Sequence, residues 1–363
     1  MEKALLVGIK FKSEKIPIEE SLEELKQLAK TAGAETVGVL TQQKDFPDLK
    51  YFIGTGKLEE LKALCEETQA DLVVFDHDIF PSQTRNLEEA LGVKVINRTE
   101  LILDIFALHA HTKEGKLQVK LAQAEYGLTH LTGHGTELSR LGGGIGTRGP
   151  GETKLEVDRR KIRKDISDYK KELSKVQKSR GLLREKRKGS ELKTISLVGY
   201  TNSGKSTLLN SLTNAKVLAE NKLFATLDPV TRRIYLPTGQ IALLTDTVGF
   251  IQKLPHTLIS AFRATLEETI EADILLHVVD ASSLYIQDQI DAVYNVLEEL
   301  KAVSKPIITV FNKIDIVKDK EKIEILSDKY SPSVIISAYY NEGLDELLKL
   351  LDQQLLLLRQ PGA

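Results

Sequence analysis

The chain has 363 residues, 41% of them hydrophobic and 28% charged, which is enough for two or three globular domains of ordinary composition. A formal net charge of −2 gives no global sign of a nucleic-acid partner, so such evidence has to come from local charge. The single cysteine, Cys65, excludes an internal disulfide and favours the cytoplasm, and the absence of an 18-residue apolar run predicts no stable membrane insertion.

Residues 1–97 alternate short β-rich runs with amphipathic helical patterns. Strands are predicted at Ala4–Phe11, Thr36–Leu40 and Asp71–Asp76, with a further one in VKVIN. Because strands and helices alternate, the sequence predicts a small α/β subdomain with a parallel sheet. The GTGK run at Gly54–Lys57 lacks the first glycine and the final hydroxyl of a phosphate loop, so we interpret it as a helix start. An ATPase site in this subdomain is therefore disfavoured.

Residues 98–190 are helical on both sides of a glycine-rich interruption, 141–152. Apolar residues on the second side, Thr153–Lys188, follow a heptad-like spacing, which predicts a long antiparallel helical hairpin with the loop at its far end. From Arg159 to Lys188 there are 14 basic and 4 acidic residues, a pattern typical of binding to a phosphate backbone. A solvated helix face and, for the loop around Arg148, a flexible linker are the alternatives.

Residues 191–363 return to alternating strands and helices and end in a leucine-rich amphipathic helix. The run Gly199–Ser206 has the spacing of a phosphate-binding loop between a strand and a helix. Lys205 is expected to neutralise β- and γ-phosphate oxygens, and the Ser206 hydroxyl to hold Mg²⁺. Nucleotide contacts are predicted for Gly199, Tyr200, Thr201, Asn202, Ser203, Gly204, Lys205, Ser206 and Thr207.

A second motif, Asp246-Thr247-Val248-Gly249, follows the next apolar strand. Asp246 is expected to bind Mg²⁺ through water, and the Gly249 amide to approach the γ-phosphate. Between the two motifs we choose Thr226 over Thr231 as the threonine that senses this phosphate through the metal. The predicted metal ligands are Ser206, Thr226 and Asp246, and the predicted catalytic residues are Lys205, Thr226 and Gly249.

A third motif, Asn312-Lys313-Ile314-Asp315, predicts the base. A carboxylate accepts from both N1–H and the exocyclic amine of guanine, whereas adenine offers neither, so Asp315 favours GTP over ATP. Ser337 and Ala338 are expected to complete the base pocket through their backbone.

The position after the second motif holds Phe250, where Ras-like GTPases have a water-orienting glutamine. Phenylalanine can neither donate nor accept a hydrogen bond, so we expect slow intrinsic hydrolysis that depends on a partner. Gln252, Arg232 and Arg233 are nearby, but nothing in the sequence assigns any of them to the water. His77, His109 and His111 have no convincing set of companion metal ligands.

The chain resembles the HflX family of translation-associated GTPases. The resemblance rests on PSQTRNLEE (Pro81–Glu89), the long run Ile96–Tyr126, GGGIGTRGPGETKLEVDRR (Gly142–Arg160), and the nucleotide motifs with Thr226 and Phe250. It implies a GTPase that binds the large ribosomal subunit, acts in ribosome splitting or rescue, and is stimulated by ribosomes. The hairpin and loop 141–152 would reach ribosomal RNA.

The sequence thus predicts three segments: an α/β subdomain (1–97), a helical hairpin (98–190) and a Ras-like P-loop G domain with a mostly parallel sheet and a C-terminal helix (191–363). We expect a cytoplasmic, monomeric enzyme with GTP as substrate and Mg²⁺ as cofactor. Two alternatives stay open: a nucleotide-gated RNA- or ribosome-binding protein with little hydrolysis, and a ribosome-assembly GTPase acting on ribosomal RNA.

Overall fold

The structure, a computed structural model, describes residues 1–12, 17–132, 154–188, 192–213, 223–253, 258 and 263–358. The chain forms two compact units. The first unit consists of Met1–Leu108 with Lys116–Ser174, and the second of His109–Gly115 with Lys175–Ala363. Within the described ranges, no helix is both long enough and apolar enough to cross a membrane.

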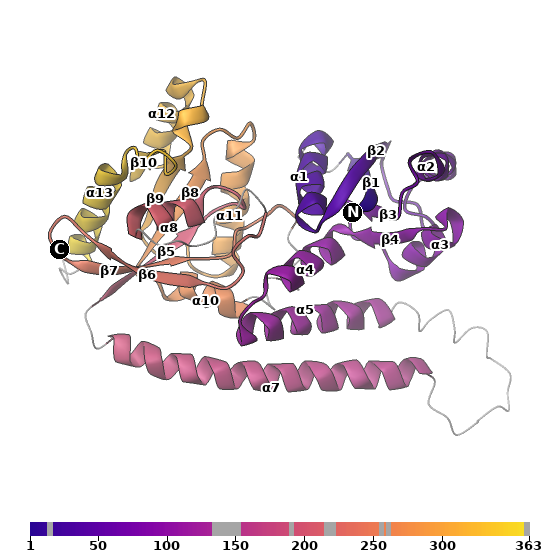
Figure 1. The fold of residues 1–363 in the computed structure, drawn as a ribbon, viewed down its shortest axis with the longest axis horizontal. Coiled ribbons are helices and arrows are strands. Elements are labelled where there is room, and N and C mark those ends of the chain that lie inside the picture. Colours follow the sequence, from indigo (N-terminus) through magenta and orange to yellow (C-terminus); the bar gives the residue numbers. More distant parts are fainter. Residues whose placement is uncertain are drawn as a thin grey trace. The chain divides into compact units, whose positions relative to one another are not determined.

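The first unit contains a four-stranded parallel sheet with the strand order β2-β1-β3-β4 (Figure 1). Its strands are β1 (Glu2–Phe11), β2 (Ala34–Lys44), β3 (Leu72–Phe75) and β4 (Lys94–Asn97), and its connecting helices are α1 (Ile18–Thr31), α2 (Thr55–Thr68) and α3 (Pro81–Leu91). Alternate β1 residues, including Leu5 and Val7, pack with α2 and α3, whereas Gly8 faces Leu22 of α1. Helices on both faces explain why β3 and the centre of β1 are continuous buried apolar runs.

The helical segment is broken where the sequence pattern predicts one continuous helix. It forms α4 (Arg98–His109) and α5 (Lys113–Thr132), and α7 (Lys154–Lys188) follows. In the first unit, Leu117 and Leu121 of α5 pack against Leu173 of α7, and the Lys170 Nζ lies 2.7 Å from a Glu125 carboxylate oxygen. The two helices run side by side in opposite directions (Figure 1). Loop 141–152 lies outside the described residues.

The second unit contains a six-stranded sheet with the order β10-β9-β8-β5-β7-β6. Its strands are β5 (Lys193–Val198), β6 (Val230–Tyr235), β7 (Ile241–Asp246), β8 (Ile274–Asp280), β9 (Ile307–Asn312) and β10 (Ser333–Ile335). Only β6 is antiparallel to its neighbour among these pairs, so the prediction of a mostly parallel sheet is confirmed. The carboxyl ends of parallel strands meet at one edge of a sheet, which is where such folds bind ligands.

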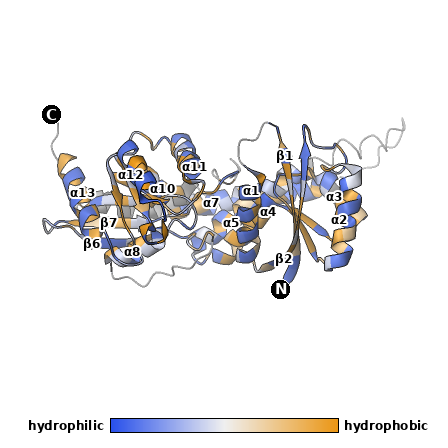
Figure 2. Ribbon diagram, turned by 90° about the horizontal axis from the view of Figure 1, so that it is seen from above, coloured by the Kyte–Doolittle hydropathy of each residue, from blue (hydrophilic) through white to orange (hydrophobic). Residues whose placement is uncertain are grey.

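Helices cover both faces of this second sheet. One face packs against α8 (Lys205–Thr213) and α13 (Leu344–Leu357), the other against α11 (Ile286–Glu299) and α12 (Lys320–Lys329). The remaining helices are α10 (Arg263–Glu271) and the short 3₁₀ helix η1 (Ile314–Ile316). Figure 2 shows hydrophobic beside hydrophilic residues on α13, as expected of a helix with one buried face.

Candidate active site

The phosphate loop joins the end of β5 to the start of α8. Gly204 has a φ of 95°, and a Cβ there would overlap the Asn312 side-chain amide. Only glycine combines this backbone conformation with so close a neighbour. The loop therefore brings its amides and the first turn of α8 to the sheet edge, an arrangement that binds anions.

Lys205 is the buried cation of this loop. Its Nζ donates to the carbonyl oxygens of Gly199 at 3.1 Å and Tyr200 at 2.8 Å. Burial lowers the pKa of Lys205 to about 8, and the nearby Asp246 carboxylate opposes that shift. An ammonium group held in a poorly solvated site with incomplete counter-charge is suited to phosphate oxygens.

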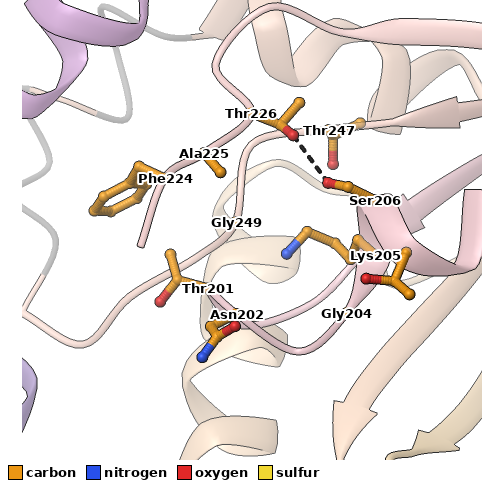
Figure 3. A pocket seen from close by; sticks show the side chains of 11 residues that line it. Thr201, Asn202, Gly204, Lys205, Ser206, Phe224, Ala225, Thr226, Thr247 and Gly249 are labelled. Atoms are coloured by element: carbon orange, nitrogen blue, oxygen red, sulfur yellow. Dashed lines mark hydrogen bonds between the residues drawn. The ribbon is translucent and has the colours of Figure 1, made fainter. Parts of the chain in front are cut away.

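Three oxygen-bearing side chains from separate segments converge beside Lys205. The Ser206 Oγ lies 2.9 Å from the Thr226 Oγ1 (Figure 3). It also donates to the Asp246 Oδ2 at 2.6 Å. The other Asp246 carboxylate oxygen, Oδ1, is buried without a hydrogen-bond partner in the described structure, and burial raises the pKa of this acid. A hard cation such as Mg²⁺ would satisfy this oxygen set, so the residues fit the metal.

Backbone contacts hold the second motif against the phosphate loop. The Thr201 amide donates to the Phe250 carbonyl at 2.7 Å, and the Phe250 amide donates to the Gly199 carbonyl at 3.1 Å. A Cβ on Gly249 would lie 3.0 Å from the Lys205 Nζ, so the backbone at this glycine passes close to the ammonium group. The Thr247 Oγ1 donates to the Leu197 carbonyl at 2.6 Å, which fixes the motif to β5.

Phe250 is 1% exposed, and its apolar ring cannot make a hydrogen bond to water. The backbone amide of Gln252 donates to the Tyr200 hydroxyl at 2.9 Å, and Gln252 is itself buried. Arg232 and Arg233 are exposed on β6. None of these four residues lines the cavity around Lys205, so the structure does not assign the water to any of them.

The base-recognition residues lie together at the ends of β9 and β10. The Asn312 Oδ1 accepts from the Ala338 amide at 3.0 Å, and the Asp315 Oδ1 accepts from the Ser337 hydroxyl at 2.6 Å. The Ser211 hydroxyl of α8 donates to the Ala338 carbonyl at 2.6 Å. Hydrogen bonds thus connect the predicted base pocket with the helix that follows the phosphate loop.

Two features of this pocket differ from the sequence-based reasoning. Asp315 is exposed, so its discrimination against adenine depends on the base covering it and not on a site buried beforehand. Lys313 forms an ion pair with Asp280 at the end of β8, with its Nζ 2.6 Å from the Asp280 Oδ2. Asp280 could not be predicted as a partner of Lys313, because a charged residue at a strand end is common.

A cavity at the sheet edge is lined by most of the predicted phosphate and metal residues and by two residues that sequence reasoning missed, Phe224 and Ala225 (Figure 3). The predicted residues in the lining are Thr201, Asn202, Gly204, Lys205, Ser206, Thr207, Thr226, Thr247 and Gly249. Phe224 and Ala225 directly precede Thr226 in the chain. Their position beside Thr226 is the only feature of the sequence that could have identified them as cavity residues. The other predicted residues of the first two motifs are not part of the lining: Gly199, Tyr200, Ser203, Asp246 and Val248.

The remaining histidine and glycine candidates have other surroundings. Gly54 is the N-cap of α2, so GTGK begins a helix. His77 contacts the rings of Phe11 and Phe52, and His111 lies in the break between α4 and α5 rather than on a helix. In the ranges that the structure describes, no group of three or more His, Cys, Asp or Glu residues could hold a metal ion.

The fold and this site define a P-loop guanine-nucleotide-binding protein. Three family profiles match the chain: "GTP-binding GTPase N-terminal" over residues 19–107, "GTP-binding GTPase Middle Region" over 109–187, and "50S ribosome-binding GTPase" over 194–313. The GTPase HflX of Caldanaerobacter subterraneus is 52% identical over 98% of this chain and 81% of its own length. That of Alkalihalophilus pseudofirmus is 49% identical over 98% and 83%.

A solved structure has a related fold over the whole chain. The crystal structure of a GTP-binding protein from Sulfolobus solfataricus in complex with GDP is 27% identical, with a TM-score of 0.51, and the alignment covers 97% of this chain and 98% of that one. The chain belongs to the GTPase HflX family, and it is a GTPase.

Proposed function

We propose that this GTPase hydrolyses GTP with Mg²⁺ at the Lys205 cavity and binds the large ribosomal subunit, where ribosomes stimulate a slow intrinsic reaction. The observation that supports the catalytic part is the convergence of the Ser206, Thr226 and Asp246 oxygens beside the buried Lys205. The reaction would be completed by water, giving GDP and phosphate.

Each residue has a distinct role in this proposal. Ser206, Thr226 and Asp246 hold the magnesium ion, which when bound supplies positive charge to phosphate oxygens. Lys205 neutralises the oxygens that gain charge as the terminal phosphate leaves, and the Gly249 amide donates to that phosphate. Asn312, Asp315 and Ala338 hold the guanine base. Ribosome contact would order the group that positions water.

Exposed charge on α7 supports an RNA partner. The exposed basic side chains in its described part are Arg160, Lys161, Arg163, Lys164, Lys170, Lys171 and Lys175. Arg159, in contrast, donates to the Leu131 carbonyl at 3.1 Å, which favours a role in closing the hairpin. A row of cations on one helix fits a phosphate backbone. The family profile described as "50S ribosome-binding GTPase" supports the large subunit as the source of that RNA.

The first experiment measures GTP turnover by the purified protein, alone and with large ribosomal subunits. We expect strong stimulation that falls in Arg148→Ala and in the double variant Lys161→Glu/Lys164→Glu. Reversing two phosphate-facing charges is expected to weaken subunit binding by about tenfold or more, with a shallower salt dependence. The matched control is Lys26→Glu/Lys30→Glu, which reverses two exposed lysines on α1. Equal, slow turnover in every sample would contradict ribosome stimulation.

Ribosome splitting or rescue is the process that we propose for this activity, in the cytoplasm and as a monomer. The buried Phe250 favours a second candidate, in which nucleotide occupancy rather than turnover controls binding. Mixing intact ribosomes with the protein and either GTP or a non-hydrolysable analogue separates the two, because only the second candidate predicts equal effects. Binding to naked ribosomal RNA but not to subunits would instead support a role in assembly.

A further inference from the structure

Asp228 lies two residues after Thr226 and accepts hydrogen bonds from the turn that begins α5. The amides of His111 and Thr112 donate to its Oδ2 at 3.0 and 2.9 Å. The Thr112 hydroxyl donates to its Oδ1. The segment His109–Gly115 belongs to the same compact unit as Asp228, so these contacts lie within the second unit. We refer to them as the Asp228–Thr112 clamp.

The turn is shaped to accept this carboxylate. The Thr112 Oγ1 accepts from the Gly115 amide at 2.9 Å, which caps the first turn of α5 and leaves the hydroxyl proton free for Asp228. A Cβ on Gly115 would overlap the Asp228 Oδ1, so a side chain at this position would displace the carboxylate. The amino end of a helix also carries partial positive charge, which favours a carboxylate here.

The clamp holds the segment that carries Thr226 at a point close to the metal ligands. Beyond Asp228 the chain enters β6, whose first residue, Val230, pairs with Asp246. Between Thr226 and Asp228, Leu227 is 1% exposed. The chain from Thr226 to Asp246 is therefore fixed by one apolar anchor, one clamp and one strand pair, and the Thr226 hydroxyl lies 2.9 Å from Ser206.

We propose that Asp228 is a positioning residue for GTP: by holding the turn at Thr112, it keeps Thr226 where it can bind the metal ion and sense the terminal phosphate. This inference rests on the proposed role of Thr226. The clamp lowers the conformational entropy that Thr226 loses when GTP binds, because the segment is already ordered. GDP lacks the γ-phosphate that Thr226 would sense, so its binding does not depend on the clamp.

The test measures the affinities of the full chain for GDP and for a non-hydrolysable GTP analogue, both with Mg²⁺, together with single-turnover hydrolysis. Asp228→Ala and Thr112→Val are expected to weaken analogue binding about tenfold, the effect of losing charge-assisted hydrogen bonds, while GDP affinity stays unchanged. Thr112→Ser keeps the hydroxyl and should bind like the wild type. The double variant should lose no more than either single variant, since both remove one clamp.

Gly115→Ala distinguishes the proposed positioning role from a purely structural role, because the two predict opposite changes in analogue affinity. Alanine favours a helix over glycine, so α5 should gain stability, whereas the added Cβ displaces Asp228. We expect this variant to lose analogue affinity although its helix is more stable. Asp319→Ala is the matched control, because Asp319 caps α12 by accepting from the Lys322 amide and lies outside the clamp.

Thr226→Ala separates failure of the inference from failure of the proposed site. If Thr226→Ala keeps wild-type analogue affinity and hydrolysis, the proposed metal site is wrong and the inference falls with it. If Thr226→Ala is impaired while Asp228→Ala and Gly115→Ala match the wild type, the inference alone is overturned. Equal loss of GDP and analogue affinity, or faster hydrolysis in the clamp variants, would also overturn it.

Discussion

Asn312 connects two loops of the nucleotide site by donating from its Nδ2 to the Ser203 carbonyl at 2.9 Å and accepting at its Oδ1 from the Ala338 amide at 3.0 Å. The side chain is 2% exposed. Its partners are the phosphate loop on one side and the loop after β10 on the other. A residue predicted to contact the base therefore also holds the base and phosphate parts of the site together.

Replacing Asn312 by alanine leaves the Ser203 carbonyl and the Ala338 amide without this partner. We expect the free energy of unfolding to fall by about 2–4 kcal/mol, since each buried group left unpaired costs about 1–3 kcal/mol. Guanine-nucleotide affinity should fall as well. Denaturant titration and fluorescent GDP binding measure the two effects, with Asn295→Ala, an exposed position on α11, as control. Unchanged stability would show that water replaces both hydrogen bonds.

The strands and the nucleotide motifs could be predicted because their signals are local. Apolar runs such as the one ending at Asp246 are buried on both faces of a sheet, and the motif residues follow those runs directly. Thr226 is the predicted metal-sensing threonine in preference to Thr231, and the family resemblance also points to Thr226. In the structure, Thr226 lies beside Ser206, and Thr231 lies on β6 with its hydroxyl 2.9 Å from that of Thr245.

The features that could not be predicted depend on contacts between distant residues. Thr112 and Asp228 are 116 positions apart, and neither belongs to a nucleotide-binding motif. The break between α4 and α5 cannot be predicted from the apolar spacing, which continues through it, and the cap formed by Thr112 depends on the folded turn. The ion pair of Lys313 with Asp280 and the exposure of Asp315 likewise follow from the fold and not from residue type.

The lowered pKa of Lys205 predicts that nucleotide affinity depends on pH. The free protein holds a charged lysine below about pH 8 and loses that proton above it, whereas bound phosphate favours the charged form. Affinity for GDP should therefore be independent of pH well below about pH 8. Above that pH it should fall, approaching a tenfold loss for each further pH unit. Titrations between about pH 7 and 9 check this. Lys205→Arg keeps its charge and, where it binds, should show a flat profile.

Buried His277 predicts a loss of stability in acid. Burial lowers its pKa to about 3, with a smaller effect from Lys205, so the folded state keeps this imidazole neutral. As the pH falls below about 6.5, the unfolded chain takes up a proton that the folded chain does not, and stability decreases until about pH 3. One pH unit below the pKa of histidine in the unfolded chain, the free energy of unfolding is lower by about 1.4 kcal/mol.

His277→Phe tests this prediction, because phenylalanine keeps an aromatic ring against Tyr294 and cannot be protonated. Urea denaturation at neutral pH and at two acidic values should give a shallower decline for the variant than for the wild type. If the variant and the wild type lose stability equally as the pH falls, groups other than His277 cause the acid sensitivity. Asp246 would not be one of them, because its raised pKa stabilises the folded state as the pH falls.

A buried ion cluster in the first unit predicts a large effect on stability without an effect on the nucleotide site. The Arg98 Nη1 donates to the Asp76 Oδ1 at 2.7 Å, and Arg98 also pairs with Glu24. Both Arg98 and Asp76 are almost fully buried. Arg98→Met removes the charge that both carboxylates share, and breaking a buried pair in this way costs about 3–5 kcal/mol.

The matched control for Arg98→Met is Arg85→Met, which removes an exposed pair in which the Arg85 Nε lies 3.1 Å from a Glu89 oxygen. This exposed pair should contribute less than about 0.5 kcal/mol. Denaturant unfolding measures both variants, and GDP affinity of the still-folded proteins should match the wild type because the nucleotide residues all lie in the second unit. A small effect of Arg98→Met would mean that Asp76 and Glu24 take up protons or water once the guanidinium is gone.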